Sequence, residues 1–253
     1  MTVQELLSAR FPSTVAEVLG LMQALERALP RDDGVVFFLR LYRAVTEAVD
    51  DAVRPGGEYA DPRFCRWLDV VFANSFFRAL RDATQRRPGV PKAWEPLIEA
   101  RSRPGVVPIQ FALAGMNAHI NFDLCVALNA TCRLLDIRLA RGSGHHRDYL
   151  RVNETLERVQ EQVKREYLSK LGQLGDDALG RVDDVVAMWK VARARDAAWT
   201  HAEALGALRA SPRLADHYLD ALGGMVGLAG RGLLVPTLRG SGAGAPRASP
   251  EGG

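Results

Sequence analysis

The sequence is poor in cysteine, with only Cys65, Cys125 and Cys132 among its 253 residues. An odd number of cysteines cannot pair completely into disulfides, and their spacing matches no cysteine-based metal motif. Cys125 and Cys132 lie seven residues apart, on one face of a helix, which suits buried free thiols. The pattern argues against a disulfide scaffold and predicts a reducing, cytoplasmic compartment.

Neither sign of charge predominates, because 33 Lys and Arg residues are mixed with 30 Asp and Glu residues, for a formal net charge of +3. A dedicated nucleic-acid surface requires a concentration of positive charge, so no nucleic-acid partner is expected. The first residues, MTVQELLSAR, lack the basic and apolar regions of a signal peptide. This also predicts a cytoplasmic location.

Several sequence signatures are missing as well. No convincing stretch alternates between apolar and polar residues as a half-buried strand does, and no internal repeat of about 20–50 residues is present. The sequence has no phosphate-cradling glycine loop, no nucleophile-elbow pattern and no HExxH motif. These absences favour an all-helical protein and give no indication of a nucleotide cofactor.

Helical periodicity fills most of the chain. Thr14 and Glu17 have capping-box spacing, and Asp61 stands before a proline at the first helical position. Helices are expected from residue 14, at about 35–49, 62–86 and 94–101, from 108, at about 146–174 and 177–208, and from 212. We predict an all-α fold, with residues 1–238 as a single domain of about seven to nine helices packed around a central polar-cored helix. Residues 239–253, rich in Gly, Pro, Ser and Ala, are predicted to be a disordered tail.

The most informative segment runs from Pro108 to Leu128 and reads PIQFALAGMNAHINFDLCVAL. Polar residues occupy every second position of its middle: Asn117, His119, Asn121 and Asp123. Burying each of them costs about 1–3 kcal/mol unless it finds a partner, so we infer a functional site on this helix. The segment is long enough to span a bilayer, but its polar residues make that improbable, and no membrane partner is expected.

On a helical wheel at about 100° per residue, Asn117 and Asn121 form one polar stripe, and His119 and Asp123 form a second, roughly opposite. The His119–Asp123 pair has three interpretations. Both side chains could ligate one metal ion, because they share a helix face. Asp123 could instead orient His119 as a general base or acid. The third interpretation is a satisfied core pair that fixes helix packing.

A second cluster begins a later helix and contains His145, His146, Asp148, Tyr149 and Asn153. Its simplest interpretation is a helix start, where Asp148 interacts with free N–H groups and the histidines are solvated. In the functional interpretation, one histidine with Asp148 or Asn153 completes the site on the central helix. The clusters meet only if that helix ends near 129–131, or if residues 136–147 fold back alongside it.

Arg193 and Trp199 are candidates on a further helix, with Trp189 one turn before Arg193. A buried Arg193 between the two tryptophans could hold a carboxylate, or pair with Asp123 or Asp148. The alternative is an ordinary amphipathic helix with paired side chains three residues apart.

Several blocks resemble a bacterial and fungal family known only as a domain of unknown function. The most specific block is GMNAHINFDL (Gly115 to Leu124), with HRDYLRVN (His146 to Asn153) downstream. Three further blocks are similar to the family: DGVVFFLRLYRAVTEAV (Asp33 to Val49), YADPRFCRWLDVVFANSFFRAL (Tyr59 to Leu80) and ARARDAAW (Ala192 to Trp199). The resemblance covers most of residues 14–200. It implies an all-helical fold and a setting near small-molecule biosynthesis, and it supplies no established reaction.

A looser resemblance is to helical zinc-dependent phospholipases and nucleases, whose His-x-x-x-Asp ligand spacing is matched by His119 and Asp123. Those enzymes need several further His and Asp ligands, and not all of these are evident in this sequence.

We therefore predict an enzyme that acts on a small organic molecule of a biosynthetic pathway. The predicted catalytic residues are His119, Asp123, Asn117 and Asn121, and the predicted substrate-binding residues are Asn153, Tyr149, Arg193 and Trp199. A divalent metal ion (zinc, manganese or iron) is expected to assist a hydrolase-like reaction. Its ligands would come from His119, Asp123, His145, His146 and Asp148.

Two alternatives stay open. One is a metal-free cyclase or isomerase of secondary metabolism that uses His119 as acid and base. The other is a non-catalytic helical protein with a binding or structural role. The sequence names neither the substrate nor the oligomeric state.

Overall fold

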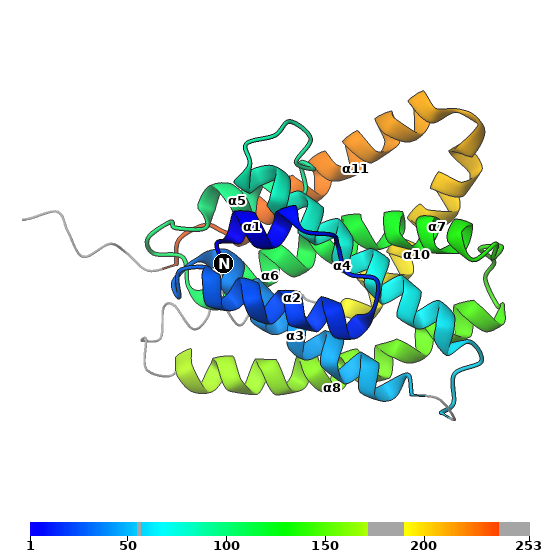
Figure 1. Ribbon diagram of the computed structural model, residues 1–253, viewed down its shortest axis with the longest axis horizontal. Coiled ribbons are helices and arrows are strands. Elements are labelled where there is room, and N and C mark those ends of the chain that lie inside the picture. The colour runs from blue at the N-terminus through cyan, green and yellow to red at the C-terminus, as the bar shows by residue number, and fades with distance from the viewer. Residues whose placement is uncertain (55–56, 172–189, 238–253) are drawn as a thin grey trace, which may run out of the picture.

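The computed structural model describes residues 1–54, 57–171 and 190–237, and all regular elements in these ranges are helices (Figure 1). Their bounds are α1 Val3–Ser8, α2 Val15–Ala28, α3 Gly34–Ala52, α4 Pro62–Thr84, α5 Glu95–Ala100, α6 Pro108–Ala118, η1 His119–Asp123, α7 Leu124–Leu134, α8 Gly144–Leu171, α10 Val191–Ala207, η2 Leu208–Ala210 and α11 Pro212–Leu233. If α6, η1 and α7 are taken as one continuous central helix, and the short η2 turn is set aside, the described ranges hold nine helices and no strand. The predicted all-α fold is confirmed. The predicted tail at 239–253 and the first part of the helix predicted at 177–208, residues 177–189, lie outside the described residues. α10 occupies most of the remainder of that predicted helix.

The predicted start signals open helices as their chemistry requires. The Thr14 hydroxyl accepts a hydrogen bond from the Glu17 N–H, and the Glu17 carboxylate accepts one from the Thr14 N–H, which completes a capping box before α2. The Asp61 carboxylate caps α4, with Pro62 as its first residue. A short helix that was not predicted, α1, begins with the same kind of box at Thr2.

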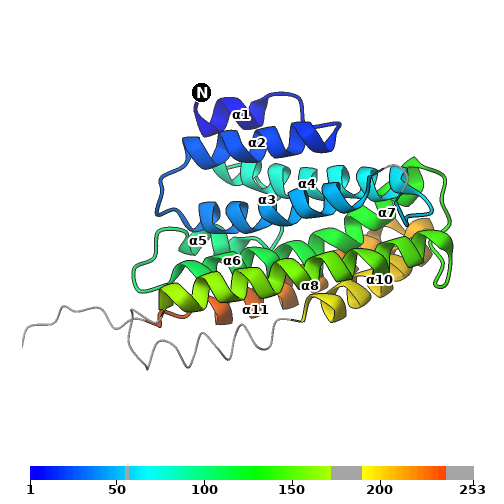
Figure 2. The same ribbon diagram turned by 90° about the horizontal axis from the view of Figure 1, so that it is seen from below.

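The helices are arranged in layers around the central helix (Figure 2). α1 and α2 form the outer layer and pack on α3 and α4. The central helix lies beneath α3 and α4, with α10 and α11 on its other side. α8 runs along the bundle and contacts α3, α4 and α10. The central helix is therefore covered on several sides by helices from both halves of the chain.

Two glycines let α3 and α6 approach closely. A Cβ atom at Gly34 would overlap the ring of Phe111, and one at Gly115 would overlap the ring of Phe38. Each helix thus offers a glycine to a phenylalanine of the other. This contact brings Phe38 within 5.7 Å of the His119 ring, measured between centroids, and so helps to position the polar centre of the central helix.

By length and composition, Pro108–Leu134 is the one helix in the described ranges that could cross a membrane, with a mean hydropathy of 1.3 over its most apolar stretch. However, 83% of that stretch is buried inside the protein. Its apolar surface is therefore covered by neighbouring helices, as in a core helix.

The central helix continues to Leu134. It therefore does not end near residues 129–131, which was one of the two conditions for the polar clusters to meet. Asp136 then adopts a left-handed backbone conformation with φ of 54°, and the chain turns before α8 begins at Gly144. α8 packs against α3, α4 and α10, and its residues Tyr149, Val152 and Leu156 line one cavity with His119. Tyr149 of the second cluster therefore reaches the cavity beside the central helix, whereas His145, His146 and Asp148 contact other parts of the chain.

Candidate active site

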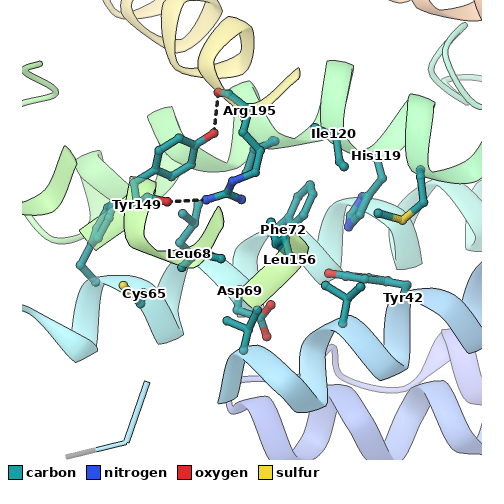
Figure 3. Close-up of a pocket in the computed structure, with 16 residues that line it drawn as sticks. Tyr42, Cys65, Leu68, Asp69, Phe72, His119, Ile120, Tyr149, Leu156 and Arg195 are labelled. Carbon is teal, nitrogen blue, oxygen red and sulfur yellow. Dashed lines mark hydrogen bonds between the residues drawn. The ribbon is translucent and has the colours of Figure 1, made fainter. Parts of the chain in front are cut away.

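A narrow cavity lies between α3, α4, the central helix, α8 and α10 (Figure 3). Its empty volume is about 640 Å³, which includes solvent at its open side. Its apolar lining consists of Val45, Val49, Phe64, Leu68, Phe72, Met116, Ile120, Leu124, Val152 and Leu156. Its other lining residues are Tyr42, Cys65, Asp69, His119, Tyr149 and Arg195. An apolar cavity with a few polar groups is typical of small-molecule sites.

His119 forms part of the cavity wall, and its side chain is 0% exposed. The imidazole stacks on the Phe72 ring with 3.5 Å between centroids, and the Tyr42 ring meets it at 4.4 Å and 67°. Its Nδ1 lies 2.9 Å from Oδ2 of Asp123. Its Nε2 is buried without a hydrogen-bond partner. The imidazole is therefore held by a hydrogen bond at Nδ1, while Nε2 makes no hydrogen bond.

Asp123 is held in turn by Trp94, a fully buried residue just before α5. The Trp94 indole N–H donates to Asp123 Oδ2 at 3.0 Å. The indole and the imidazole thus converge on one carboxylate oxygen. When this carboxylate is ionised, it accepts a hydrogen bond from the Nδ1–H group of His119. The imidazole then has a lone pair on Nε2, as in the carboxylate–histidine pair of a general-base catalyst.

His119–Asp123 form a single π-helical turn inside the otherwise α-helical segment. The Leu124 N–H bonds to the carbonyl of His119, five residues earlier. This extra residue shifts the face of all later residues by about 100° relative to an uninterrupted α-helix. Single π-turns occur frequently at functional sites, and in this chain the turn coincides with the His–Asp pair.

Burial acts on both members of the pair. It lowers the pKa of His119 well below its ordinary value. It raises the pKa of Asp123 well above its ordinary value, and the Trp94 indole partly offsets that rise. Both shifts favour uncharged side chains. When the pair holds a single proton, on Nδ1, Nε2 is an acceptor; a second proton makes Nε2 a donor. Gain and loss of one proton is what acid–base catalysis requires.

Tyr42 and Asp69 are cavity residues that the sequence analysis missed. The Tyr42 hydroxyl and Oδ2 of Asp69 are both buried without a partner. Burial, reinforced by the Asp50 carboxylate, raises the pKa of Asp69 to about 7. Burial and then the negative charges of Asp69 and Asp123 raise the pKa of Tyr42 well above its ordinary value. The Thr46 hydroxyl partly offsets this, although the two hydroxyls form no well-directed hydrogen bond. Near neutral pH, Asp69 is therefore able to exchange a proton.

The sequence did hold a signal for both residues. Asp69 is four positions after Cys65 and three before Phe72, on the inward stripe of α4. Tyr42 has the same place between Phe38 and Val45 on α3. A carboxylic acid or phenol on such a stripe points inward together with its polar atom. The two residues were missed because their neighbours on the stripe are mostly apolar and indicate an ordinary core position.

Arg195 of α10 lies at another part of the cavity wall and is 6% exposed. Its Nε donates to Oδ1 of Asn153 at 2.6 Å. Its Nη2 donates to the backbone carbonyl of Tyr149 at 2.7 Å (Figure 3). The Tyr149 hydroxyl donates to the Arg195 carbonyl at 2.7 Å. Two predicted substrate-binding residues, Tyr149 and Asn153, therefore position this guanidinium.

The predicted buried arginine is the wrong one, because Arg193 is exposed. Two residues correspond to about 200° around a helix, so only one of Arg193 and Arg195 points inward. Trp199 is buried against His146 and Tyr149, and its indole donates to Glu203, but it does not line the cavity. Trp189 lies outside the described residues.

Asn117 and Asn121, predicted to be catalytic, lie on the other side of the central helix. Asn117 donates to the Val226 carbonyl of α11 at 2.9 Å, and Asn121 donates to Oδ1 of Asn117 at 3.0 Å. Gln110, on the same stripe, donates to the carbonyls of Leu233 and Val235. This polar stripe therefore fastens the C-terminal segment and does not face the cavity.

The second cluster secures the start of α4. The Asp148 carboxylate accepts hydrogen bonds from the N–H groups of Ala60 and Asp61, at 2.9 and 2.7 Å. His145 Nε2 lies 3.1 Å from Oδ2 of Asp61. At the start of α8 itself, His146 Nδ1 accepts a hydrogen bond from the Gly142 N–H at 3.0 Å.

The five predicted metal ligands are thus divided between two places. His119 and Asp123 contact each other and Trp94, whereas the three residues of the second cluster contact the backbone and side chains around residues 60 and 142. Among the described residues, no group of three or more His, Cys, Asp and Glu side chains is placed to hold one metal ion.

The comparisons with known proteins give a family and no chemistry. No curated protein and no solved structure matches the chain. The model of a family of unknown function, DUF5995, matches residues 15–236, well over half of the sequence. The match spans every element of the cavity. The chain therefore belongs to the family DUF5995.

Proposed function

We propose that this protein is an enzyme that transfers a proton on a small, largely apolar organic molecule, with His119 as its acid–base group. The observation that carries the proposal is the unpartnered Nε2 of a fully buried histidine whose Nδ1 is held by Asp123. A buried polar atom without a partner costs about 1–3 kcal/mol. A core pair that only fixed helix packing would have no reason to keep such an atom at a cavity wall.

The residues divide the work as follows. Asp123, held by Trp94, fixes the orientation of the imidazole and stabilises the positive charge that forms when Nε2 accepts a proton. The stacked Phe72 ring prevents rotation of the imidazole. The apolar lining limits the access of water to the bound molecule, which strengthens each electrostatic contact in the cavity.

A second proton-bearing group stands beside the first. Tyr42 contacts the His119 ring, and Asp69 lies close enough to raise the pKa of the Tyr42 hydroxyl. Asp69, with a pKa of about 7, supplies a proton at neutral pH. Removal of a proton by His119 and delivery of one by Asp69 or Tyr42 conserves atoms and electrons. The reaction class that fits this arrangement is isomerisation or cyclisation without net redox change.

A metal-assisted hydrolysis has less support from the described side chains. Nδ1 of His119 is taken by Asp123, and Asp69 is the single carboxylate among the residues that line the cavity. A catalytic metal site normally has three protein ligands. The acid–base assignment therefore accounts better for the residues that meet at this cavity.

The experiment uses hydrogen exchange, since this requires no knowledge of the product. The protein is incubated in D₂O with a panel of small apolar ketones and carboxylic acids, and NMR follows replacement of C–H by C–D. Wild type is expected to accelerate exchange for at least one compound that binds. His119→Gln is expected to slow it about 10²–10⁴-fold, the usual contribution of a general base.

His145→Gln is the matched control, because this half-buried histidine pairs with Asp61 outside the cavity, and it should exchange at the wild-type rate. The proposal fails if compounds that bind exchange no faster with wild type than with His119→Gln. Metal content of the same samples tests the alternative: about one equivalent of zinc, manganese or iron, lost in His119→Gln and Asp123→Ala, would support the metal-assisted reaction.

A further inference from the structure

Arg195 carries a positive charge into the cavity wall without a negative partner. Across the described residues, no carboxylate lies within ion-pair distance of its guanidinium, although the side chain is 6% exposed. Its contacts are the neutral Asn153 side chain, the Tyr149 carbonyl, and the face of the Tyr149 ring at 4.1 Å from Cζ. Buried charges are almost always paired, because an unpaired one is costly.

The neighbouring carboxylates are already used by other groups. Asp148 accepts two backbone N–H groups at the start of α4, and Asp196, next to Arg195 in sequence, pairs with Arg141 at the surface. The contacts of Arg195 use its Nε and Nη2 atoms. Hydrogen-bonding capacity on Nη1 is left, and a guanidinium binds carboxylates and phosphates through such donors.

The space beside Arg195 is apolar and elongated. In Figure 3, Phe72 lies between Arg195 and His119, with Leu68, Ile120 and Leu156 around it. The α3 lining extends from Tyr42 to Val49, and seven helical steps correspond to about 10 Å along a helix. A molecule that occupies this space needs an anionic end for Arg195 and an apolar body.

From this arrangement, and building on the proposed function, we propose that the ligand is an amphipathic monocarboxylic acid, with its carboxylate on Arg195 and its apolar body extending toward His119. A single guanidinium balances a single negative charge. A phosphate would bring additional negative charge into a cavity that already contains Asp69. The charge balance therefore favours a carboxylate.

Three probes of equal chain length test the assignment: octanoate, octyl phosphate and octanol. Binding to the purified wild-type chain is measured by calorimetry at fixed ionic strength. Octanoate is expected to bind at least about 10-fold more tightly than octanol, because a charge-assisted hydrogen bond is added. Arg195→Gln should weaken octanoate about 10-fold or more and leave octanol nearly unchanged.

Arg193→Gln is the matched control, since it removes the same charge from the same helix at an exposed position. It should bind octanoate like wild type. Equal binding of octanoate and octanol by wild type overturns the proposal even if Arg195→Gln does not fold. So does equal weakening by the two arginine variants, and so does octyl phosphate binding more tightly than octanoate.

Equilibrium binding requires no turnover, so its result is independent of proton transfer by His119. Octanoate binding without any His119-dependent exchange would remove the proposed function and keep the carboxylate site. Exchange that is restricted to uncharged compounds, with no preference for octanoate, would do the reverse.

Discussion

The two polar faces of the central helix differ in how completely their hydrogen bonds are made. On the α11 side, Asn117 donates to a backbone carbonyl and accepts from Asn121. On the cavity side, His119 is bound through Nδ1 alone, and its Nε2 has no partner. Both faces break the apolar pattern of the helix, yet only one leaves a polar atom unused. An unused atom on a residue that lines the cavity, rather than polarity itself, separates the candidate catalytic face from the structural one.

The largest expected effect tests the cavity face. Asp123→Asn should slow the exchange reaction about 10²–10⁴-fold, because a neutral amide cannot stabilise the positive charge that forms on the imidazole when Nε2 accepts a proton. The rate is measured by the D₂O exchange assay. Asn121→Ala, on the opposite face, is the control and should react at the wild-type rate. Equal rates for wild type and Asp123→Asn would contradict the assignment of the cavity face.

The structural face should respond in stability instead. Asn117→Ala removes the bond to the Val226 carbonyl and the acceptor of the Asn121 side chain. The free energy of unfolding is expected to fall by about 1–3 kcal/mol, measured by urea denaturation, while the exchange rate of the folded protein is unchanged. A variant that unfolds like wild type but loses activity would show that this face also serves the reaction.

Stability should also depend on pH through Asp69. Its pKa rises from 3.8 in the unfolded chain to about 7 in the folded one, so between these values the folded state binds more protons. Stability from this group is fully present below about pH 4 and is lost as pH rises through 7. The Asp69 side chain is half-buried, with its Oδ2 atom inside the protein. Because solvent screens the exposed part of the group, the loss is expected to be about 1–2 kcal/mol.

Asp69→Asn provides the comparison. Urea denaturation at several pH values between 4 and 8 should show a steeper decline for wild type than for the variant. Parallel curves for the two proteins would mean that Asp69 titrates normally, and its role as a proton donor near neutral pH would be withdrawn.

Features set by nearby residues could be predicted from the sequence. The helix starts at Thr14 and Asp61 depend on caps within three or four residues, and His119 and Asp123 stand out because their own segment is otherwise apolar. The all-α fold follows from the same local periodicity.

Features set by tertiary packing could not be predicted. Whether Arg193 or Arg195 points inward depends on how α10 is rotated against α8, and the periodicity of α10 is too weak to fix this. The π-turn at His119–Asp123 adds a residue that a uniform wheel does not include. Trp94, whose indole N–H donates to Asp123, is 29 residues distant from it in sequence. The sequence offers no pattern that links these two residues.

The smallest effect concerns the second histidine cluster. His145→Gln removes a half-buried contact with Asp61 and should lower the free energy of unfolding by about 0–1 kcal/mol. Asp148→Asn should cost more, because its carboxylate accepts two backbone N–H groups that join α8 to the start of α4, and charged acceptors contribute about 1.5–3 kcal/mol. Urea denaturation measures both. A structural cluster should lose more stability in Asp148→Asn than in His145→Gln, because Asp148 accepts two backbone N–H groups, and both variants should keep the wild-type exchange rate. Loss of exchange activity in both variants would instead assign the cluster to catalysis.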